Sequence, residues 1–399
     1  MILAVRMTFS QAYNPSWELR FFPFINYNLN RFEMPGDNKD FTKLFSKFDT
    51  MLQKGSGAIS IVHIGGSHIQ ADIYTHRVRQ LLQSMYPGIL GSRGFFFPYK
   101  IAHTNSPSNL RINYTGEWLT SKNTQAQPAL TLGLSGITTS LVNDSASIGL
   151  IARYDSIYRY DFNKVRIYCS PVNDSCLPRI LPPSLVSNSF YNTKAHYLQF
   201  DLNSYIDSLN IKVYRGDSLH PFELYGISLD NDDPGITYNA IGVNGAMLKS
   251  YLQCNLFAAQ LQSLEPDWII ISIGTNEGNT RNFNADAYRQ NYIKMIRVIR
   301  ECAPDAALLL TVPNDSYLNK RYINHNTSII RDIIYEIARE NSCGVWDFYT
   351  IMGGLNSARA WYNNGLMAKD HIHFNKPGYI LKGELFYTAF MESWSNSIK

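Results

Sequence analysis

The chain contains no apolar stretch long enough to cross a bilayer as a helix, so it predicts no transmembrane segment. It also contains no lysine- and arginine-rich run and no zinc-knuckle spacing, and we therefore expect no nucleic-acid partner. Charged residues make up only 17% of the 399 residues, and the net charge of +4 is spread along the chain. A mildly basic balance of this kind is compatible with an anionic polymer, such as a cell-wall glycan.

Cysteine is also scarce. None of the five cysteines forms a Cys-x-x-Cys pair or a cluster with histidine, which excludes the usual zinc and redox motifs. Cys169 and Cys176 are close enough in sequence to bridge a loop, as in an exported protein. Five free and mostly buried thiols fit the sequence equally well. The five positions are Cys169, Cys176, Cys254, Cys302 and Cys343.

The beginning of the chain gives little structural information. Residues 1–12 are weakly apolar and end in a small residue, as the remnant of a trimmed signal peptide would, but their apolar core is too short for a complete one. We expect export to the periplasm or the cell envelope. Residues 1–43 form a lead-in rich in Phe, Asn and Tyr whose fold the sequence does not predict.

Five short apolar runs predict the strands of a parallel sheet, because each run is continuous rather than alternating. Amphipathic, helix-like stretches follow most of them, which predicts a three-layer α/β/α doubly wound parallel sheet. The predicted strands are Ala58–Ile64, Ile236–Val243, Trp268–Ile273, Ala306–Val312 and Gly344–Phe348. The predicted helices are Asp72–Met85, Ala246–Leu264, Ala285–Cys302 and Ile329–Asn341.

The strand–helix alternation is interrupted between the first and second strands by a segment far longer than a normal crossover. This segment is rich in Ser, Asn, Pro and Tyr and contains short alternating pieces, such as Lys164–Tyr168 and Ile211–Tyr214. It predicts an inserted all-β domain, a sandwich or jelly roll, over residues 112–225. The α/β domain is then expected over residues 44–111 and 226–399.

Four short motifs carry the candidate chemistry. The first strand ends in Gly65-Gly66-Ser67, where glycines admit a sharp strand-to-helix turn and a serine could act as nucleophile. An ordinary turn or helix cap is the alternative for this motif. After the second strand, a glycine such as Gly245 can offer its backbone N–H to an oxyanion without a side chain in the way.

The third motif, Gly274-Thr275-Asn276-Glu277, follows the most apolar strand and places a neutral amide donor at its carboxyl end. The fourth is Asp370-His371-Ile372-His373, in which Asp370 can orient His373 as a general base. Metal binding by His371 and His373 is the competing interpretation, but no third ligand cluster supports it. The sequence therefore favours a triad and predicts no metal.

The order of these motifs resembles the four blocks of the SGNH (GDSL-like) hydrolases. The resemblance covers Lys43–Arg111 and Gly226–Trp394. It implies that Ser67 is the nucleophile, that Asp370 and His373 complete the triad, and that no cofactor is needed. It also implies an oxyanion hole made by Ser67, Gly245 and Asn276. One departure is Gly66, which stands where the family has Asp; His68 is expected only to pack the turn.

The Ser-His block and the large β insert further resemble bacterial peptidoglycan O-acetylesterases with a carbohydrate-binding-module-like domain. This implies removal of acetyl groups from the C6 hydroxyl of N-acetylmuramic acid through an acetyl-serine. Alternatives are an O-acetylesterase for another polysaccharide or a sialylated glycan, and a catalytically weak glycan-binding protein. Arg93, Phe95 and Tyr99 are candidates for the rim of a glycan groove, or for an internal aromatic plug. The oligomeric state is not predicted.

Overall fold

The computed structural model describes residues 19–397, apart from residues 157, 174 and 218–220. The predicted remnant of a signal peptide lies outside these residues. The strands of the α/β part form one parallel sheet in the order β13-β1-β14-β15-β18, close to the predicted runs. Their bounds are β1 (Ala58–Gly65), β13 (Gly235–Gly242), β14 (Trp268–Ser272), β15 (Ala307–Thr311) and β18 (Gly344–Trp346).

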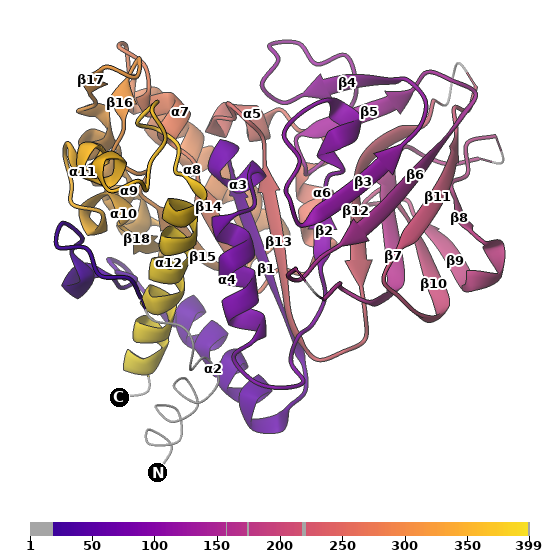
Figure 1. Cartoon of the computed structure of the whole chain (residues 1–399), viewed down its shortest axis with the longest axis horizontal. Helices are drawn as coiled ribbons and strands as arrows, with labels where there is room; N and C mark the ends of the chain where they lie inside the picture. The colour runs from indigo at the N-terminus through magenta and orange to yellow at the C-terminus, as the bar shows by residue number, and fades with distance from the viewer. Residues whose placement is uncertain (1–18, 157, 174, 218–220, 398–399) are drawn as a thin grey trace.

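Helices cover both faces of this sheet, as Figure 1 shows, so the predicted three-layer α/β/α fold is confirmed. Because successive side chains of a strand point to opposite faces, Ile61 packs with one set of helices and Val62 with the other. The first set is α2 (Lys39–Lys54), α4 (Tyr74–Gln83) and α12 (Lys376–Asn396). The second is α5 (Leu248–Leu252), α6 (Phe257–Gln262), α8 (Ala285–Cys302) and α9 (Asn326–Glu340).

One predicted helix is wrong in its extent. The stretch from 246 to 264 is not a single helix but the two short helices α5 and α6. Between them the backbone N–H of Leu256 donates to the carbonyl of Leu132, in the β part of the chain, instead of continuing α5. A contact from another part of the chain thus interrupts a pattern that is locally helical.

The lead-in before residue 44 packs against the α/β part. Its described residues include a short 3-10 turn, η1 (Tyr27–Leu29), and the beginning of α2. Glu33 pairs with Val345 of β18 as an isolated antiparallel bridge, and Phe32 packs in the same core as α12. The parallel sheet is therefore closed at this edge by the lead-in.

The inserted β domain is confirmed as two antiparallel sheets that enclose their own apolar core. Its strands extend beyond residues 112–225, since β12 reaches Asp230 and β2 (Gly94–Phe96) pairs with it. The smaller sheet has β3 (Leu110–Tyr114), β6 (Ser145–Ala152), β11 (Leu209–Tyr214) and β8 (Arg179–Leu181). The larger sheet has β2, β4 (Trp118–Lys122), β5 (Ile137–Leu141), β12 (Glu223–Asp230), β7 (Phe162–Cys169), β10 (Tyr197–Ile206) and β9 (Val186–Asn192).

Cys169 and Cys176 lie in this sandwich core as free thiols. Of the two alternatives from the sequence, free and buried thiols rather than a disulfide bridge are therefore found in the described residues. Burial, together with the neighbouring Cys176, raises the pKa of the Cys169 thiol. Both cysteines act as small apolar residues in this core.

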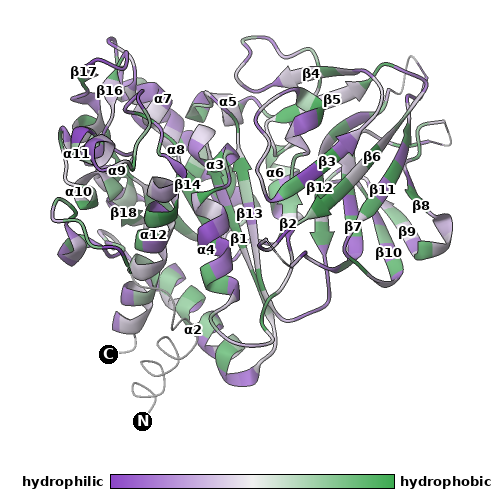
Figure 2. Cartoon of the chain, viewed as in Figure 1, coloured by the Kyte–Doolittle hydropathy of each residue, from purple (hydrophilic) through white to green (hydrophobic). Residues whose placement is uncertain are grey.

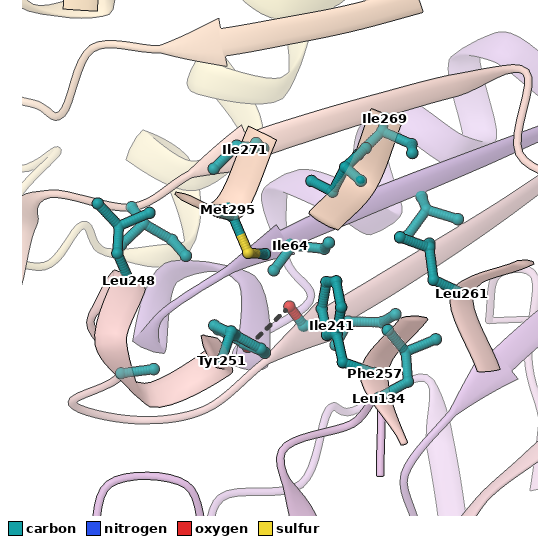
Figure 3. Packing of buried hydrophobic residues seen from close by; sticks show 14 of the residues in the cluster. Ile64, Leu134, Ile241, Leu248, Tyr251, Phe257, Leu261, Ile269, Ile271 and Met295 are labelled. Carbon is teal, nitrogen blue, oxygen red and sulfur yellow. Dashed lines mark hydrogen bonds between the residues drawn. The ribbon is translucent and has the colours of Figure 1, made fainter. Parts of the chain in front are cut away.

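The two parts also share a core. Figure 3 shows Leu134, from the loop between β4 and β5, beside Phe257 and Leu261 of α6 and Ile241 of β13. In the same cluster the hydroxyl of Tyr251 donates to the carbonyl of Ile241 at 3.4 Å. Figure 2 shows apolar residues along the strands of the parallel sheet. Among the described residues no helix is both long and apolar enough to span a membrane.

Candidate active site

Ser67 lies at the switch point of the parallel sheet. The chain leads from β1 to its neighbour β13 on one side, whereas β14, the neighbour on the other side, leads away to β15 in the opposite direction. A crevice therefore opens between the carboxyl ends of β1 and β14. Ser67 begins the short helix α3 (Ser67–Gln70) there, directly after Gly65 and Gly66. A Cβ on Gly65 would lie 2.3 Å from the Cγ1 atom of Ile69 and 2.8 Å from the carbonyl oxygen of Ser272. Only glycine fits at Gly65, which brings the serine to the sheet edge.

The structure brings Ser67, His373 and Asp370 into one hydrogen-bonded chain. The Oγ atom of Ser67 lies 2.8 Å from Nε2 of His373, and Nδ1 of His373 lies 2.8 Å from Oδ2 of Asp370. A carboxylate at Nδ1 assigns the ring proton to that nitrogen and leaves the Nε2 lone pair facing the serine hydroxyl. This arrangement can remove a proton from the serine during nucleophilic attack.

Asp370 is held by its own loop. Its Oδ1 atom accepts hydrogen bonds from the backbone N–H groups of Ile372 and His373, each at 3.0 Å. Burial raises the pKa of Asp370, but the hydrogen bonds from the His373 ring and from these backbone groups outweigh burial, and the pKa is lowered overall. Asn314, in the segment that follows β15, supports the same loop by donating from Nδ2 to the carbonyl of Ile372 at 3.1 Å.

Gly245 lies in a tight turn after β13. Ala246 N–H donates to the carbonyl of Val243 at 2.9 Å, and Gly245 has a φ of +81°, as position i+2 of a type II turn requires. A Cβ added to Gly245 would meet no atom nearer than Cγ2 of Thr124, at 3.8 Å, so the space beside this residue is open. The turn thus exposes backbone next to the serine.

Asn276 lies in α7 (Thr275–Gly278), at the carboxyl end of β14. Its Nδ2 atom donates to the carbonyl of Ala246 at 2.8 Å, which joins the Asn276 segment to the Gly245 turn. The second proton of this amide remains for a ligand. A Cβ on Gly66 would lie 3.2 Å from the same Nδ2 atom, so glycine at this position leaves the Asn276 amide uncrowded.

Glu277 makes a second connection between these segments. Its Oε1 atom accepts the backbone N–H of Leu248, at the start of α5, at 2.7 Å. Burial raises the pKa of Glu277 to about 7, although the hydrogen bond from Leu248 and the charge of Lys249 act in the opposite direction. The sequence places Glu277 in the third motif but predicts no role for it, because a Glu after Asn at a helix start is not distinctive.

Gln70 is a second residue that sequence reasoning missed. Its Oε1 atom accepts the backbone N–H of Asn244 at 2.7 Å, and its Nε2 atom donates to Thr104 Oγ1 at 3.1 Å and to the Asn105 carbonyl at 2.9 Å. The side chain is buried and holds the turn that contains Gly245. Its position three residues after the serine was the only available signal.

The expected glycan-binding role of Arg93, Phe95 and Tyr99 is wrong, because all three side chains are buried. Arg93 forms an ion pair with the buried carboxylate of Asp72 at 3.3 Å, and the Tyr99 hydroxyl donates to the Gly242 carbonyl at 2.8 Å. Burial of an arginine requires such a partner. The alternative prediction, an internal aromatic plug, therefore describes this segment correctly.

His371 and His373 do not converge on a common point. The ring of His371 stacks on Tyr317 at 4.5 Å, whereas His373 faces Ser67. Among the described residues no group of three or more His, Cys, Asp or Glu side chains could hold a metal ion.

His68 is buried behind the triad. Its ring lies 5.1 Å from the ring of His373, and its Nδ1 atom is 3.0 Å from the Tyr379 hydroxyl. Burial lowers the pKa of His68 far below its usual value, and the charges of Lys382 and His373 lower it further. A neutral His68 can pack against the His373 ring without opposing a positive charge there.

The fold and the site define a class of protein. Residues 215–381 match the GDSL-like lipase/acylhydrolase family, and this range contains Gly245, Asn276, Asp370 and His373 but not Ser67. The protein is a carboxylic ester hydrolase with a GDSL-like α/β fold. No curated protein sequence matches the chain.

A solved structure of a peptidoglycan O-acetylesterase has a similar fold. It matches with a TM-score of 0.72 and 21% identity over 90% of this chain and 98% of its own. A lipase/acylhydrolase from Enterococcus faecalis matches 40% of this chain and 77% of its own, at 18% identity and a TM-score of 0.32. An acetylxylan esterase from Geobacillus stearothermophilus matches 40% of this chain and 74% of its own, at 16% identity and a TM-score of 0.31.

Proposed function

We propose that the protein is a serine esterase that removes O-acetyl groups from a glycan, with Ser67, His373 and Asp370 as its triad. The observation that carries the proposal is the hydrogen-bonded chain from Ser67 through His373 to Asp370, with distances of 2.8 Å at both steps. We further propose that the glycan is peptidoglycan acetylated at the C6 hydroxyl of N-acetylmuramic acid. The similar fold of a peptidoglycan O-acetylesterase, including its extent over both parts of the chain, supports this choice of polymer.

In this mechanism Ser67 attacks the acetyl carbonyl carbon while His373 takes the serine proton at Nε2. The negative charge on the carbonyl oxygen is stabilised by the N–H groups of Ser67 and Gly245 and by the Asn276 amide. The C–O bond to the sugar then breaks, and the sugar oxygen leaves with the proton from His373. Water, activated by the same imidazole, hydrolyses the acetyl-serine and releases acetate.

The antiparallel β part, over residues 112–225 and its flanking strands, is proposed to contribute to glycan binding. Its loop between β4 and β5 reaches the site, since Thr124 is the nearest neighbour of the open space at Gly245. An enzyme with this substrate must be exported, so its proposed location is the periplasm or the cell envelope.

The first test is the variant Ser67→Ala with a small aryl acetate. Removal of the nucleophile is expected to lower kcat by about 10³-fold or more. Ser46→Ala, an exposed serine of α2, is the matched control and should keep full activity. Equal activity of Ser67→Ala and the parent enzyme would end the esterase proposal.

The second test identifies the polymer by the release of acetate. O-acetylated peptidoglycan is expected to lose its acetyl groups, which mass analysis of muropeptides detects. Acetate released only from acetylxylan or from a sialylated glycan would move the assignment to that polymer. Binding of peptidoglycan without any release would indicate a weak enzyme that serves as a glycan-binding protein.

A further inference from the structure

Three aromatic side chains gather beside the triad, and we call Tyr317, Tyr362 and His371 the aromatic shelf. The ring of His371 lies 4.5 Å from that of Tyr317, nearly parallel at 20°, and 4.6 Å from that of Tyr362, tilted at 56°. Tyr317 belongs to β16 (Tyr317–Leu318), and Tyr362 to α11 (Ser357–Asn363). Three separate segments of the chain thus contribute one ring each.

The aromatic shelf is continuous with the catalytic loop. His371 lies two residues before His373, and its carbonyl accepts the backbone N–H of Tyr317 at 3.1 Å. The backbone of His371 has a φ of +52°, in the left-handed region that residues other than glycine rarely adopt. The loop that positions the His373 imidazole at the serine therefore also positions the His371 ring in the shelf.

The shelf is partly open to solvent, unlike the aromatic clusters of the core. Tyr362 is 36% exposed, and Tyr317 and His371 are half-buried. The Tyr317 hydroxyl lies at an exposed edge and donates to Oδ1 of Asn356 at 2.8 Å, whereas the Nδ1 atom of His371 is buried and has no partner within the described part of the chain. Partly exposed tyrosine rings with a hydroxyl at the edge suit an amphipathic ligand better than an aliphatic one.

We propose that the aromatic shelf binds a pyranose ring of the glycan chain, next to the acetylated sugar that occupies the triad. The faces of a pyranose carry C–H groups that pack on aromatic rings, while its hydroxyls can bond the polar edge of the shelf. Two basic residues lie near the shelf in sequence: Arg359 is one helical turn before Tyr362, and Lys369 is two residues before His371. Neither forms an ion pair among the described residues, and their positive charge suits a glycan that carries carboxylates. This subsite rests on the proposed glycan esterase function.

The location of the shelf fits a chain-like substrate. In Figure 1 the hairpin β16–β17 (Tyr322–Ile323) and the β4–β5 hairpin of the β part lie at the same end of the molecule, with α3 between them. A linear glycan that crosses the site from the β part reaches the aromatic shelf on the other side of Ser67.

The test compares two substrates in the variant Tyr362→Ala. We expect KM for O-acetylated peptidoglycan fragments to rise by about 5- to 10-fold, while hydrolysis of 4-nitrophenyl acetate stays within about twofold, because the small ester does not reach the shelf. Tyr362→Phe keeps the ring and should retain most of the affinity. Phe21→Ala removes another exposed, stacked ring, on Tyr27 at 5.3 Å in the lead-in, and should change neither substrate.

The possible outcomes distinguish a failure of the proposed sugar subsite from a failure of the proposed esterase function. An unchanged KM for the glycan fragments, or equal losses on both substrates, would overturn the aromatic shelf as a sugar site. If the parent enzyme hydrolyses the aryl ester but no glycan acetate, the glycan assignment fails, and the subsite with it.

Discussion

The ammonium group of Lys382 lies inside the α/β part, surrounded by three aromatic rings. It is 4.4 Å from the ring centre of Phe348, 5.0 Å from that of Tyr74 and 5.4 Å from that of Phe374. Burial lowers the pKa of Lys382 to about 7. The three rings offset part of the lost hydration through cation–π contacts, but no carboxylate pairs with the amine among the described residues.

The pKa of Lys382 predicts how stability changes with pH. Between pH 7 and about 10 the unfolded chain holds a proton on this lysine that the folded chain does not, so the free energy of unfolding rises with pH in this window. Lys382→Met should therefore stabilise the protein at pH 6 and much less at pH 9. We expect the difference between the two gains to be about 3 kcal/mol, measured by urea unfolding.

The exposed residue Lys194 offers a control, since Lys194→Met should leave the pH dependence of unfolding unchanged. If Lys382→Met destabilised the protein equally at both pH values, the lysine would be stabilising through packing, and its lowered pKa would have no role.

At the scale of single residues, the sequence predicted those that belong to spaced motifs and missed those that act through tertiary contacts. Ser67, Asp370 and His373 were recognisable from their order in the chain, and the structure brings them together. The error on Arg93 has a physical cause: its partner Asp72 lies 21 residues earlier, and no local pattern marks a buried ion pair.

At the scale of elements, two connecting segments must keep a fixed distance for the proposed oxyanion site to form. The turn after β13 carries Gly245, and α7 after β14 carries Asn276. The hydrogen bonds from Asn276 to Ala246 and from Leu248 to Glu277 join these segments at 2.8 and 2.7 Å. Donors held in this way need little rearrangement when charge develops on the substrate.

Glu277 tests this coupling. Glu277→Ala should lower kcat for an aryl acetate by about 10-fold with KM within about twofold, because the donors are displaced while the pocket remains. Glu277→Gln keeps an oxygen that accepts the Leu248 N–H and should restore most of the activity. A similar loss in both variants would show that the negative charge of the carboxylate matters, not its hydrogen bond.

The elements themselves were predictable where the local pattern decides the structure. All five parallel strands lie within a residue or two of the apolar runs, because strands covered on both faces must be apolar throughout. The division of the predicted helix into α5 and α6 was not predictable, since the bond from Leu256 to Leu132 joins residues far apart in sequence. The strand β2 was missed for a similar reason: its partner β12 lies on the far side of the insert.

At the scale of the whole molecule, the β part and the α/β part are joined by a common apolar core. Leu134 and Tyr225 of the β part belong to the same buried cluster as Ile241 and Phe257 of the α/β part. Polar contacts follow the same boundary, since the N–H of Leu134 donates to Oε1 of Gln260 at 2.8 Å. Chains of this size often unfold in several steps, but a core that belongs to both parts opposes separate unfolding.

We therefore expect one cooperative unfolding transition, with equal calorimetric and van't Hoff enthalpies. Leu134→Ala removes a fully buried side chain from the boundary and should lower the free energy of unfolding by roughly 2–5 kcal/mol, while the transition stays single and the triad stays active below it. Leu181→Ala, at a position that is 40% exposed, should change the free energy of unfolding by less than about 1 kcal/mol.

Two unfolding transitions, of which Leu134→Ala shifts only one, would show that the two parts of the chain fold independently. The β part would then be a separable glycan-binding module, because the position of its β4–β5 loop beside Gly245 would not depend on a shared core.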